Sequence, residues 1–273
     1  MKILRTIDEV RETLKPLRAR GAIGLVPTMG ALHAGHVALF TVARSECDTV
    51  VASLFVNPTQ FNDPKDLAAY PRDEQRDERM ASEAGVDFLF APAAEEIYPA
   101  GHATWVEVEG AALGLEGDFR PGHFRGVATV CLKLFTIVGP HRAYFGQKDA
   151  QQVAVVTQMV HDLNVDLEIR VVPTVRDTDG LALSSRNARL SPEERTRALA
   201  IPRALDAGRQ ATRQGADPVA AAKAALTGLE IDYVAVRNFS GHPVLFVAAR
   251  AGRTRLIDNV RLDEDAPEHT HGQ

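Results

Sequence analysis

The sequence has little cysteine and no excess of positive charge. Only two cysteines, Cys47 and Cys131, occur among 273 residues, and neither has a CxxC partner or a histidine at metal-ligand spacing. We therefore expect two buried, reduced thiols and no disulfide. The formal net charge of −5 argues against a protein that binds nucleic acid, because such binding needs a basic surface to displace counterions.

Signals for membranes and export are also missing. No stretch approaches the roughly 20 consecutive apolar residues that a transmembrane helix needs. The first ten residues contain acidic side chains and no apolar core segment, unlike a secretory signal or a typical transit peptide. We expect a cytoplasmic protein without membrane contact. Its 45% hydrophobic and 25% charged residues are ordinary for a globular chain, and its length allows one large domain or two unequal ones.

The first two thirds of the sequence alternate short apolar runs with helical patterns. The runs predict strands at 22–26, 49–56, 86–90, 142–145 and 167–172. The helical patterns lie at 37–46, 74–84, 127–138 and 149–163. This alternation predicts an α/β fold with a Rossmann-like parallel sheet and helices on both faces. Ligands of such sheets bind beyond the carboxyl ends of the strands.

The pattern changes after about residue 174. Ser191 followed by Pro192 is typical of a helix start, and a long helix rich in Ala and Arg follows. A second Ala-rich helix at 218–229 precedes three short strand patterns, at 233–236, 244–249 and 254–258. We expect a larger domain at 1–174 and a smaller C-terminal α+β domain at 175–273, with a disordered polar tail at 264–273.

A mixed-charge stretch occupies residues 72–79, with the sequence Arg-Asp-Glu-Gln-Arg-Asp-Glu-Arg. Opposite charges recur there at helical spacing. We interpret the stretch as a solvated helix face.

The strongest local motif is His33-Ala34-Gly35-His36, at the junction of the first long strand and its helix. Gly35 removes a side chain where a nucleotide could approach, the helix start offers N–H groups, and the imidazoles can donate to phosphate. By itself the motif is equally compatible with a surface turn or a helix cap. Its spacing differs from the His-x-x-x-His zinc pair, so we predict no protein metal site.

Together with Pro27-Thr28-Met29-Gly30, this motif resembles the nucleotidylyltransferase superfamily, and specifically the pantothenate synthetases. Further blocks follow in the order found in that family: FVNPTQF at 55–61, YPR at 70–72, EIYP at 96–99, RPGHFRGV at 120–127, FGQKDAQQ at 145–152 and DGLALSSRN at 179–187. One position departs from the family pattern, because Gln147 stands where the family usually has Glu.

The resemblance implies an ATP-dependent ligase that joins (R)-pantoate to β-alanine. Pantoate would attack the α-phosphorus of ATP to give pantoyl adenylate and pyrophosphate, and the amine of β-alanine would then displace AMP. Residues 1–174 would bind nucleotide and pantoate, Mg2+ would accompany ATP, and the enzyme would be a homodimer.

The resemblance also implies roles for individual residues. His36 is the expected proton donor and His33 assists binding, while Lys148 and Arg186 neutralise phosphate charge. Asp149 and Gly146 would contact the ribose and Val175 the adenine, and the loop with Ser184, Ser185 and Arg186 would close over the phosphates. The full expected ATP set is Met29, Gly30, Ala31, Leu32, His33, Ala34, Gly35, His36, Gly146, Gln147, Lys148, Asp149, Val175, Leu183, Ser184, Ser185 and Arg186. The expected pantoate and β-alanine set is Gln60, Gln152, Asn57, Pro27, Met29 and Arg120.

Two other functions remain open at this point. One is a nucleotidyltransferase that stops after nucleotide transfer, from which Gln60 and Gln152 would distinguish the ligase. The other is a nucleotide-binding regulator without catalysis. The joint presence of four residues argues against it: His33, His36, Lys148 and Arg186. A purely structural protein would have no reason to gather polar loops at strand ends.

Overall fold

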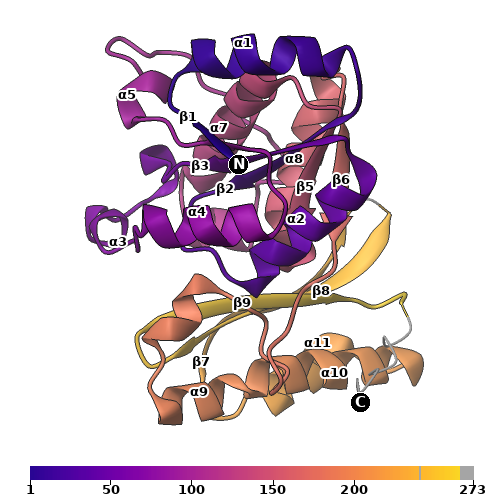
Figure 1. Cartoon of the computed structure of the whole chain (residues 1–273). Helices are drawn as coiled ribbons and strands as arrows, with labels where there is room; N and C mark the ends of the chain where they lie inside the picture. Colours follow the sequence, from indigo (N-terminus) through magenta and orange to yellow (C-terminus); the bar gives the residue numbers. More distant parts are fainter. Residues whose placement is uncertain (240, 265–273) are drawn as a thin grey trace. The chain divides into compact units, whose positions relative to one another are not determined.

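The computed structural model describes residues 1–239 and 241–264, which form two compact units (Figure 1). The first unit comprises Met1–Val175 and Leu183–Ser185, and the second comprises Arg176–Ala182 and the chain from Arg186 onward. The chain thus leaves the first unit after Val175 and returns to it briefly at Leu183–Ser185. Apart from Glu264, the tail predicted to be disordered lies outside the described residues.

The first unit is built on a six-stranded sheet in the order β1-β4-β3-β2-β5-β6, and every neighbouring pair is parallel. The strands are β1 (Lys2–Leu4), β2 (Ile23–Thr28), β3 (Thr49–Leu54), β4 (Phe88–Phe90), β5 (Arg142–Gly146) and β6 (Glu168–Val172). The predicted parallel α/β sheet is confirmed. Strand β1 was not predicted, because three residues are too few to show a periodic pattern.

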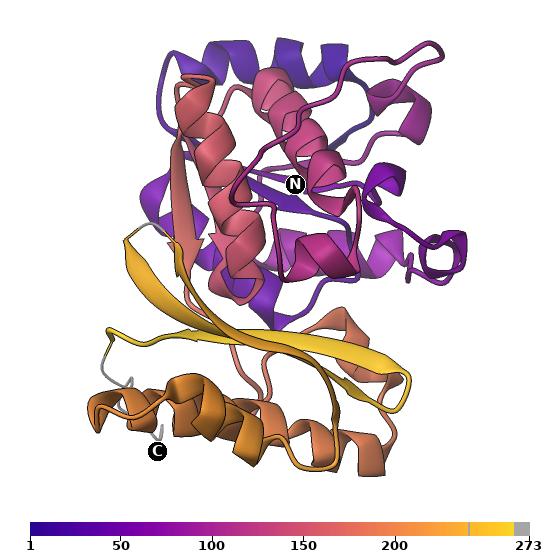
Figure 2. The same ribbon diagram turned by 180° about the vertical axis from the view of Figure 1, so that it is seen from behind.

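Helices cover both faces of this sheet (Figures 1 and 2). They are α1 (Ile7–Arg18), α2 (Ala34–Glu46), α3 (Pro64–Ala68), α4 (Glu74–Glu83), α5 (Ala94–Ile97), α6 (Glu116–Phe119), α7 (His123–Val138) and α8 (Ala150–Asp162), with short 3-10 turns η1 (Pro58–Gln60) and η2 (Gln147–Asp149). One apolar cluster joins α1, α7 and α8 to Ile23 and Leu25 of β2, whereas a second joins α2 and α4 to Val26 of the same strand. Alternate side chains of a strand point to opposite faces, so β2 contributes to both clusters.

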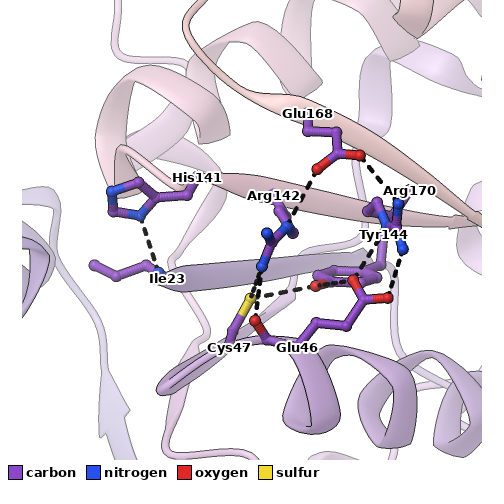
Figure 3. A network of polar contacts seen from close by, with 8 residues as sticks. All are labelled: Ile23, Glu46, Cys47, His141, Arg142, Tyr144, Glu168 and Arg170. Carbon is purple, nitrogen blue, oxygen red and sulfur yellow. Dashed lines mark hydrogen bonds and ion pairs between the residues drawn. The ribbon is translucent and has the colours of Figure 1, made fainter. Parts of the chain in front are cut away.

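A polar network fastens the end of α2 to the last two strands (Figure 3). The Glu46 carboxylate accepts hydrogen bonds from Arg170 of β6 at 2.7 Å and from the Tyr144 hydroxyl of β5 at 3.0 Å. Arg142, the first residue of β5, donates to the Glu46 carbonyl at 2.7 Å and to the Glu168 carboxylate at 3.2 Å. The network therefore fixes the C-terminal end of α2, while the opposite end of that helix begins at the His-x-Gly-His motif.

The second unit has an antiparallel sheet in the order β7-β8-β9, packed against helices. Its elements are η3 (Ser185–Arg189, whose first residue belongs to the first unit), α9 (Pro192–Ala198), α10 (Ala200–Arg213), α11 (Pro218–Ala225), β7 (Glu230–Phe239), β8 (His242–Ala251) and β9 (Thr254–Arg261). The predicted smaller C-terminal α+β part is confirmed. The long helix expected after Ser191 is divided at Leu199 into α9 and α10, because Pro202 has no N–H to donate to the carbonyl four residues earlier.

Candidate active site

The loop between β2 and α2 has an unusual backbone. Gly30 and Ala31 both have positive φ angles, of 84° and 52°, which turn the chain sharply before α2 begins at Ala34. The Gly30 N–H donates to the Thr28 hydroxyl at 3.3 Å. The loop therefore leaves the carboxyl end of β2 in a fixed course that ends at His33.

The two histidines of the motif cap α2 with their side chains. Nδ1 of His33 accepts a hydrogen bond from the Gly35 N–H at 3.1 Å, and Nδ1 of His36 accepts one from the His33 N–H at 3.2 Å. A ring nitrogen that accepts carries no proton, so the proton of each neutral ring sits on Nε2. Two N–H groups that the sequence suggested for phosphate are thus occupied by the rings, and the Nε2–H groups become the donors.

Both imidazoles are neutral at physiological pH. Burial and, to a lesser extent, the nearby positive charge of Lys148 together lower the pKa of His33 to about 4. Burial, together with the positive charge that His33 gains at acid pH, lowers the pKa of His36 to about 3. The ring centroids are 4.2 Å apart. The motif therefore presents two adjacent neutral N–H donors.

Lys148 lies on the turn η2, directly after β5. Its ammonium group is 3.3 Å from the Asp149 carboxylate, and its side chain is 19% exposed. Because the charges of Lys148 and Asp149 act on both imidazoles, the predicted cation and the His-x-Gly-His motif share one site.

A second group of predicted residues follows β3. The Asn57 amide donates to Oε1 of Gln60 at 3.0 Å and to the Gly126 carbonyl at 3.1 Å. The Gln60 amide donates to Sδ of Met29 at 2.8 Å. Asn57 and Gln60 are only 1% and 7% exposed. The contact with Met29 brings the residues expected to bind pantoate against the loop expected to bind ATP.

The start of α7 supports the Gln60 turn. His123 donates from Nδ1 to the Gln60 carbonyl at 2.9 Å, so its Nε2 accepts from Arg120 at 3.1 Å. Burial and the charge of Arg120 lower the pKa of His123 to about 4, consistent with a neutral ring. Gly126 allows the close approach of α7, since a Cβ at this position would lie 2.5 Å from the Thr59 carbonyl oxygen.

The segment expected to close over ATP is divided between the two units. Val175 and Leu183 belong to the first unit and are joined by a hydrogen bond from the Leu183 N–H at 2.9 Å. Leu183 lies next to the His-x-Gly-His motif, because a Cβ added at Gly35 would lie 3.9 Å from the Cβ of Leu183. Arg186, the predicted phosphate ligand, belongs to the second unit, whereas Lys148 belongs to the first.

The remaining predicted residues lie on the same loops or in the strands and helices beside them. Pro27 is in β2, Leu32 and Ala34 flank His33, Gly146 and Gln147 precede Lys148, Gln152 is in the first turn of α8, and Ser184 and Ser185 follow Leu183. The neighbouring Gln151 has a structural role, since its amide bonds the backbone of Ala111, Gly114 and Glu116.

Two residues near the site were missed by the sequence interpretation. Asp77 was assigned to a solvated helix face, but it is 1% exposed and accepts hydrogen bonds from the loop after β2; for this residue the interpretation was wrong. His123 lies in the quoted block at 120–127, yet no role was given to it. The spacing of residues in the sequence did not show that Asp77 and His123 are buried.

Both cysteines are free and buried, and burial raises the pKa of Cys131 to about 12. Within residues 1–239 and 241–264, no three His, Cys, Asp or Glu side chains gather in a way that could hold a metal ion. A helix long and apolar enough to cross a membrane is also absent from these residues.

The sequence matches the family described as Pantoate-beta-alanine ligase over residues 2–261. It is 51% identical over 280 residues to the pantothenate synthetase of Moorella thermoacetica, covering 96% of this chain and 99% of that protein. The fold is similar to the crystal structure of pantothenate synthetase from Thermus thermophilus, with a TM-score of 0.90, 48% identity and coverage of 96% and 99%. It is also similar to the Francisella tularensis pantoate-beta-alanine ligase complexed with beta-gamma ATP and beta-alanine, with a TM-score of 0.84, 38% identity and coverage of 97% and 99%. The chain therefore belongs to the pantoate-beta-alanine ligase family, as its sequence motifs predicted.

Proposed function

We propose that this protein condenses (R)-pantoate with β-alanine at the expense of ATP, giving pantothenate, AMP and pyrophosphate. The observation that carries the proposal is the hydrogen bond from Gln60 to Met29, which unites the polar turn after β3 with the loop after β2. The similar Francisella protein was crystallised with beta-gamma ATP and beta-alanine, which supports the same substrates here.

The reaction has two displacement steps. In the first, a carboxylate oxygen of pantoate attacks the α-phosphorus of ATP, the bond to the bridging oxygen breaks, and pyrophosphate leaves. In the second, the β-alanine nitrogen attacks the acyl carbon of the adenylate, AMP leaves, and the nitrogen loses a proton. The substrates supply both nucleophiles, so the protein contributes orientation and charge stabilisation.

For the phosphates we propose three kinds of partner. His33 and His36 donate from Nε2–H to phosphate oxygens, and the low pKa of each ring suits a hydrogen-bond donor better than a free acid. Lys148 neutralises charge that develops at the α-phosphorus, and Arg186 and the hydroxyls of Ser184 and Ser185 add further donors. The rest of the proposed nucleotide site consists of Met29, Gly30, Ala31, Leu32, Ala34, Gly35, Gly146, Gln147, Asp149, Val175 and Leu183.

For pantoate we propose Gln60, Gln152 and Asn57, with Pro27, Met29 and Arg120 at the edge of the site. Amide groups both donate and accept, so they recognise hydroxyls and a carboxylate without burying a further charge. Arg120 donates to the Gln60 carbonyl at 3.3 Å, so its positive charge lies beside Gln60, where we propose that it attracts the anionic substrate.

Mg2+ is proposed to arrive with ATP, held by phosphate oxygens and water, because the described residues form no cluster of protein ligands for it. Residues 1–174 would form the Rossmann-like domain for nucleotide and pantoate, residues 175–273 would form the smaller C-terminal domain, and the enzyme would be a cytoplasmic homodimer.

The test uses the purified protein with ATP, Mg2+, D-pantoate and β-alanine. We expect AMP and pyrophosphate in equal amounts together with pantothenate. Without β-alanine, enzyme-bound pantoyl adenylate should accumulate and pyrophosphate should appear in a single burst. AMP formation that does not depend on pantoate would refute the ligase, and a stable nucleotidyl product would indicate a nucleotidyltransferase.

A further inference from the structure

Asp77 is a buried carboxylate on α4 that faces the loop between β2 and α2. It is 1% exposed, although its neighbours in the mixed-charge stretch are largely solvated. A buried carboxylate requires hydrogen-bond donors to offset its loss of hydration. Its donors therefore reveal what the residue holds.

Those donors are two successive backbone amides of the loop. The Ala31 N–H donates to Oδ2 of Asp77 at 2.8 Å, and the Leu32 N–H donates to Oδ1 at 2.8 Å. The Ala31 amide lies within the turn with positive φ at Gly30 and Ala31, and the Leu32 amide directly follows it. Left-handed geometry is unfavourable for a residue with a Cβ, so Ala31 keeps it only where the surroundings impose it. The carboxylate supplies that constraint by binding both amides at once.

The same helix also binds the carbonyl side of the loop. Arg76 donates to the Leu32 carbonyl at 3.1 Å, so both backbone polar groups of Leu32 bond to α4. Gly30 also packs closely against Asp77, since a Cβ added at Gly30 would lie only 2.8 Å from Oδ2 of Asp77. His33 follows Leu32 directly and sets the position of the imidazole pair.

We propose that Asp77 is a positioning residue for ATP. It holds Gly30, Ala31 and Leu32 in the course that directs the Nε2–H groups of His33 and His36 toward the phosphates. This inference rests on the proposed function, because it assumes that the loop binds ATP. It adds to the site a side chain that touches none of the three substrates.

The first test replaces the acceptor with the least change in shape. Asp77→Asn keeps one oxygen but turns an NH2 group toward a backbone N–H, and Asp77→Ala removes both acceptors. We expect each variant to raise the KM for ATP, and the Kd of a non-hydrolysable ATP analogue, by at least tenfold. The KM for β-alanine should change less than threefold.

The matched control is Asp73→Ala on the same helix. Asp73 caps α4 by accepting from the Arg76 N–H at 3.1 Å, so its loss weakens the helix without removing the bonds from Asp77 to the loop. If Asp73→Ala lowers the melting temperature as much as Asp77→Asn does but leaves the KM for ATP unchanged, the result supports the positioning role of Asp77. An equal rise in ATP KM in both variants would assign the effect to helix stability and overturn the inference.

Should the Asp77 variants fail to fold, Arg76→Ala tests whether α4 positions the same loop, because Arg76 is an exposed residue that bonds the Leu32 carbonyl. Its charge control is Arg79→Ala, also exposed on α4. We expect a severalfold rise in the analogue Kd for Arg76→Ala alone, and equal values for the two variants would overturn the inference. Wild-type protein that neither binds the analogue nor makes pantothenate would refute the proposed function, whereas active wild type with unaltered analogue binding in the variants refutes only the role of Asp77.

Discussion

At the scale of single residues, Lys148 is the most direct test of the chemistry. It lies at the end of β5, and its charge acts on the imidazoles of His33 and His36. We expect Lys148→Ala to lower the rate of pyrophosphate release by about a hundredfold or more, because a preorganised cation at a phosphoryl centre contributes a large share of transition-state stabilisation. Circular dichroism should show an intact fold.

Lys133→Ala is the control for this prediction, because Lys133 is a lysine of the same unit that packs over Tyr98 at 5.6 Å from the ring centroid. Its variant should keep the wild-type rate. A Lys148→Ala enzyme that works at full rate would leave Lys148 as an ordinary surface cation.

Residue types and their spacing were enough to predict which side chains lie near one another in the site. They were not enough to predict which residues hold those side chains in position. Met29, Gln60, His33 and Lys148 were all proposed from motifs, and the structure brings them onto adjoining loops. Asp77 was missed because its burial depends on a loop some 45 positions earlier in the chain, which no local periodicity records. The proton positions on the histidines also depended on contacts that the sequence does not show.

At the scale of elements, the packing of α7 on the turn η1 positions the proposed pantoate site. Gly126→Ala would place a Cβ 2.5 Å from the Thr59 carbonyl and 2.8 Å from the Gln60 N atom, and backbone atoms cannot move aside cheaply. We expect about 1–3 kcal/mol of destabilisation from this overpacking. Displacement of Gln60 and Asn57 should also raise the KM for pantoate at least tenfold, measured at saturating ATP.

Val130→Ala gives the comparison within the same helix. Val130 is buried in the core of the first unit, so its truncation also lowers stability but leaves the contact with η1 in place. An unchanged pantoate KM in Gly126→Ala, or an equal increase in Val130→Ala, would show that the approach of α7 does not position the substrate residues.

The elements with strong periodicity were predicted well, and the exceptions have local causes. The central strands are apolar runs flanked by helices, so their parallel arrangement followed from alternation alone. The division of the helix after Ser191 depended on one proline, Pro202, three residues into α10. Strands β7 and β8 are ten residues long and extend well beyond the predicted cores, because antiparallel pairing continues through residues whose side chains alternate less clearly.

At the scale of the whole molecule, three neutral histidines, one buried and two partly buried, should make stability depend on pH. His33, His36 and His123 all belong to the first unit, and burial lowers their pKa values to about 4, 3 and 4 from the usual 6.5. Above pH 6.5 both folded and unfolded chains carry neutral rings, so these groups add no pH dependence. Below it the unfolded chain binds protons that the folded unit excludes, and stability falls until the folded pKa values are reached.

The expected slope between pH 6 and pH 5 is up to about 1.4 kcal/mol per pH unit for each histidine, with stability falling as the pH falls. Carboxylates such as Glu46, whose ion pair with Arg170 lowers its pKa, lose their contribution only at lower pH. The sequence has a single tryptophan, and Trp105 lies in the first unit, so its fluorescence during urea unfolding reports on this unit alone. His36→Gln should flatten the slope by about one histidine's share. A slope identical in wild type and His36→Gln would mean that His36 is already protonated in the folded protein, and its proposed action as a neutral Nε2–H donor to ATP would fail with it.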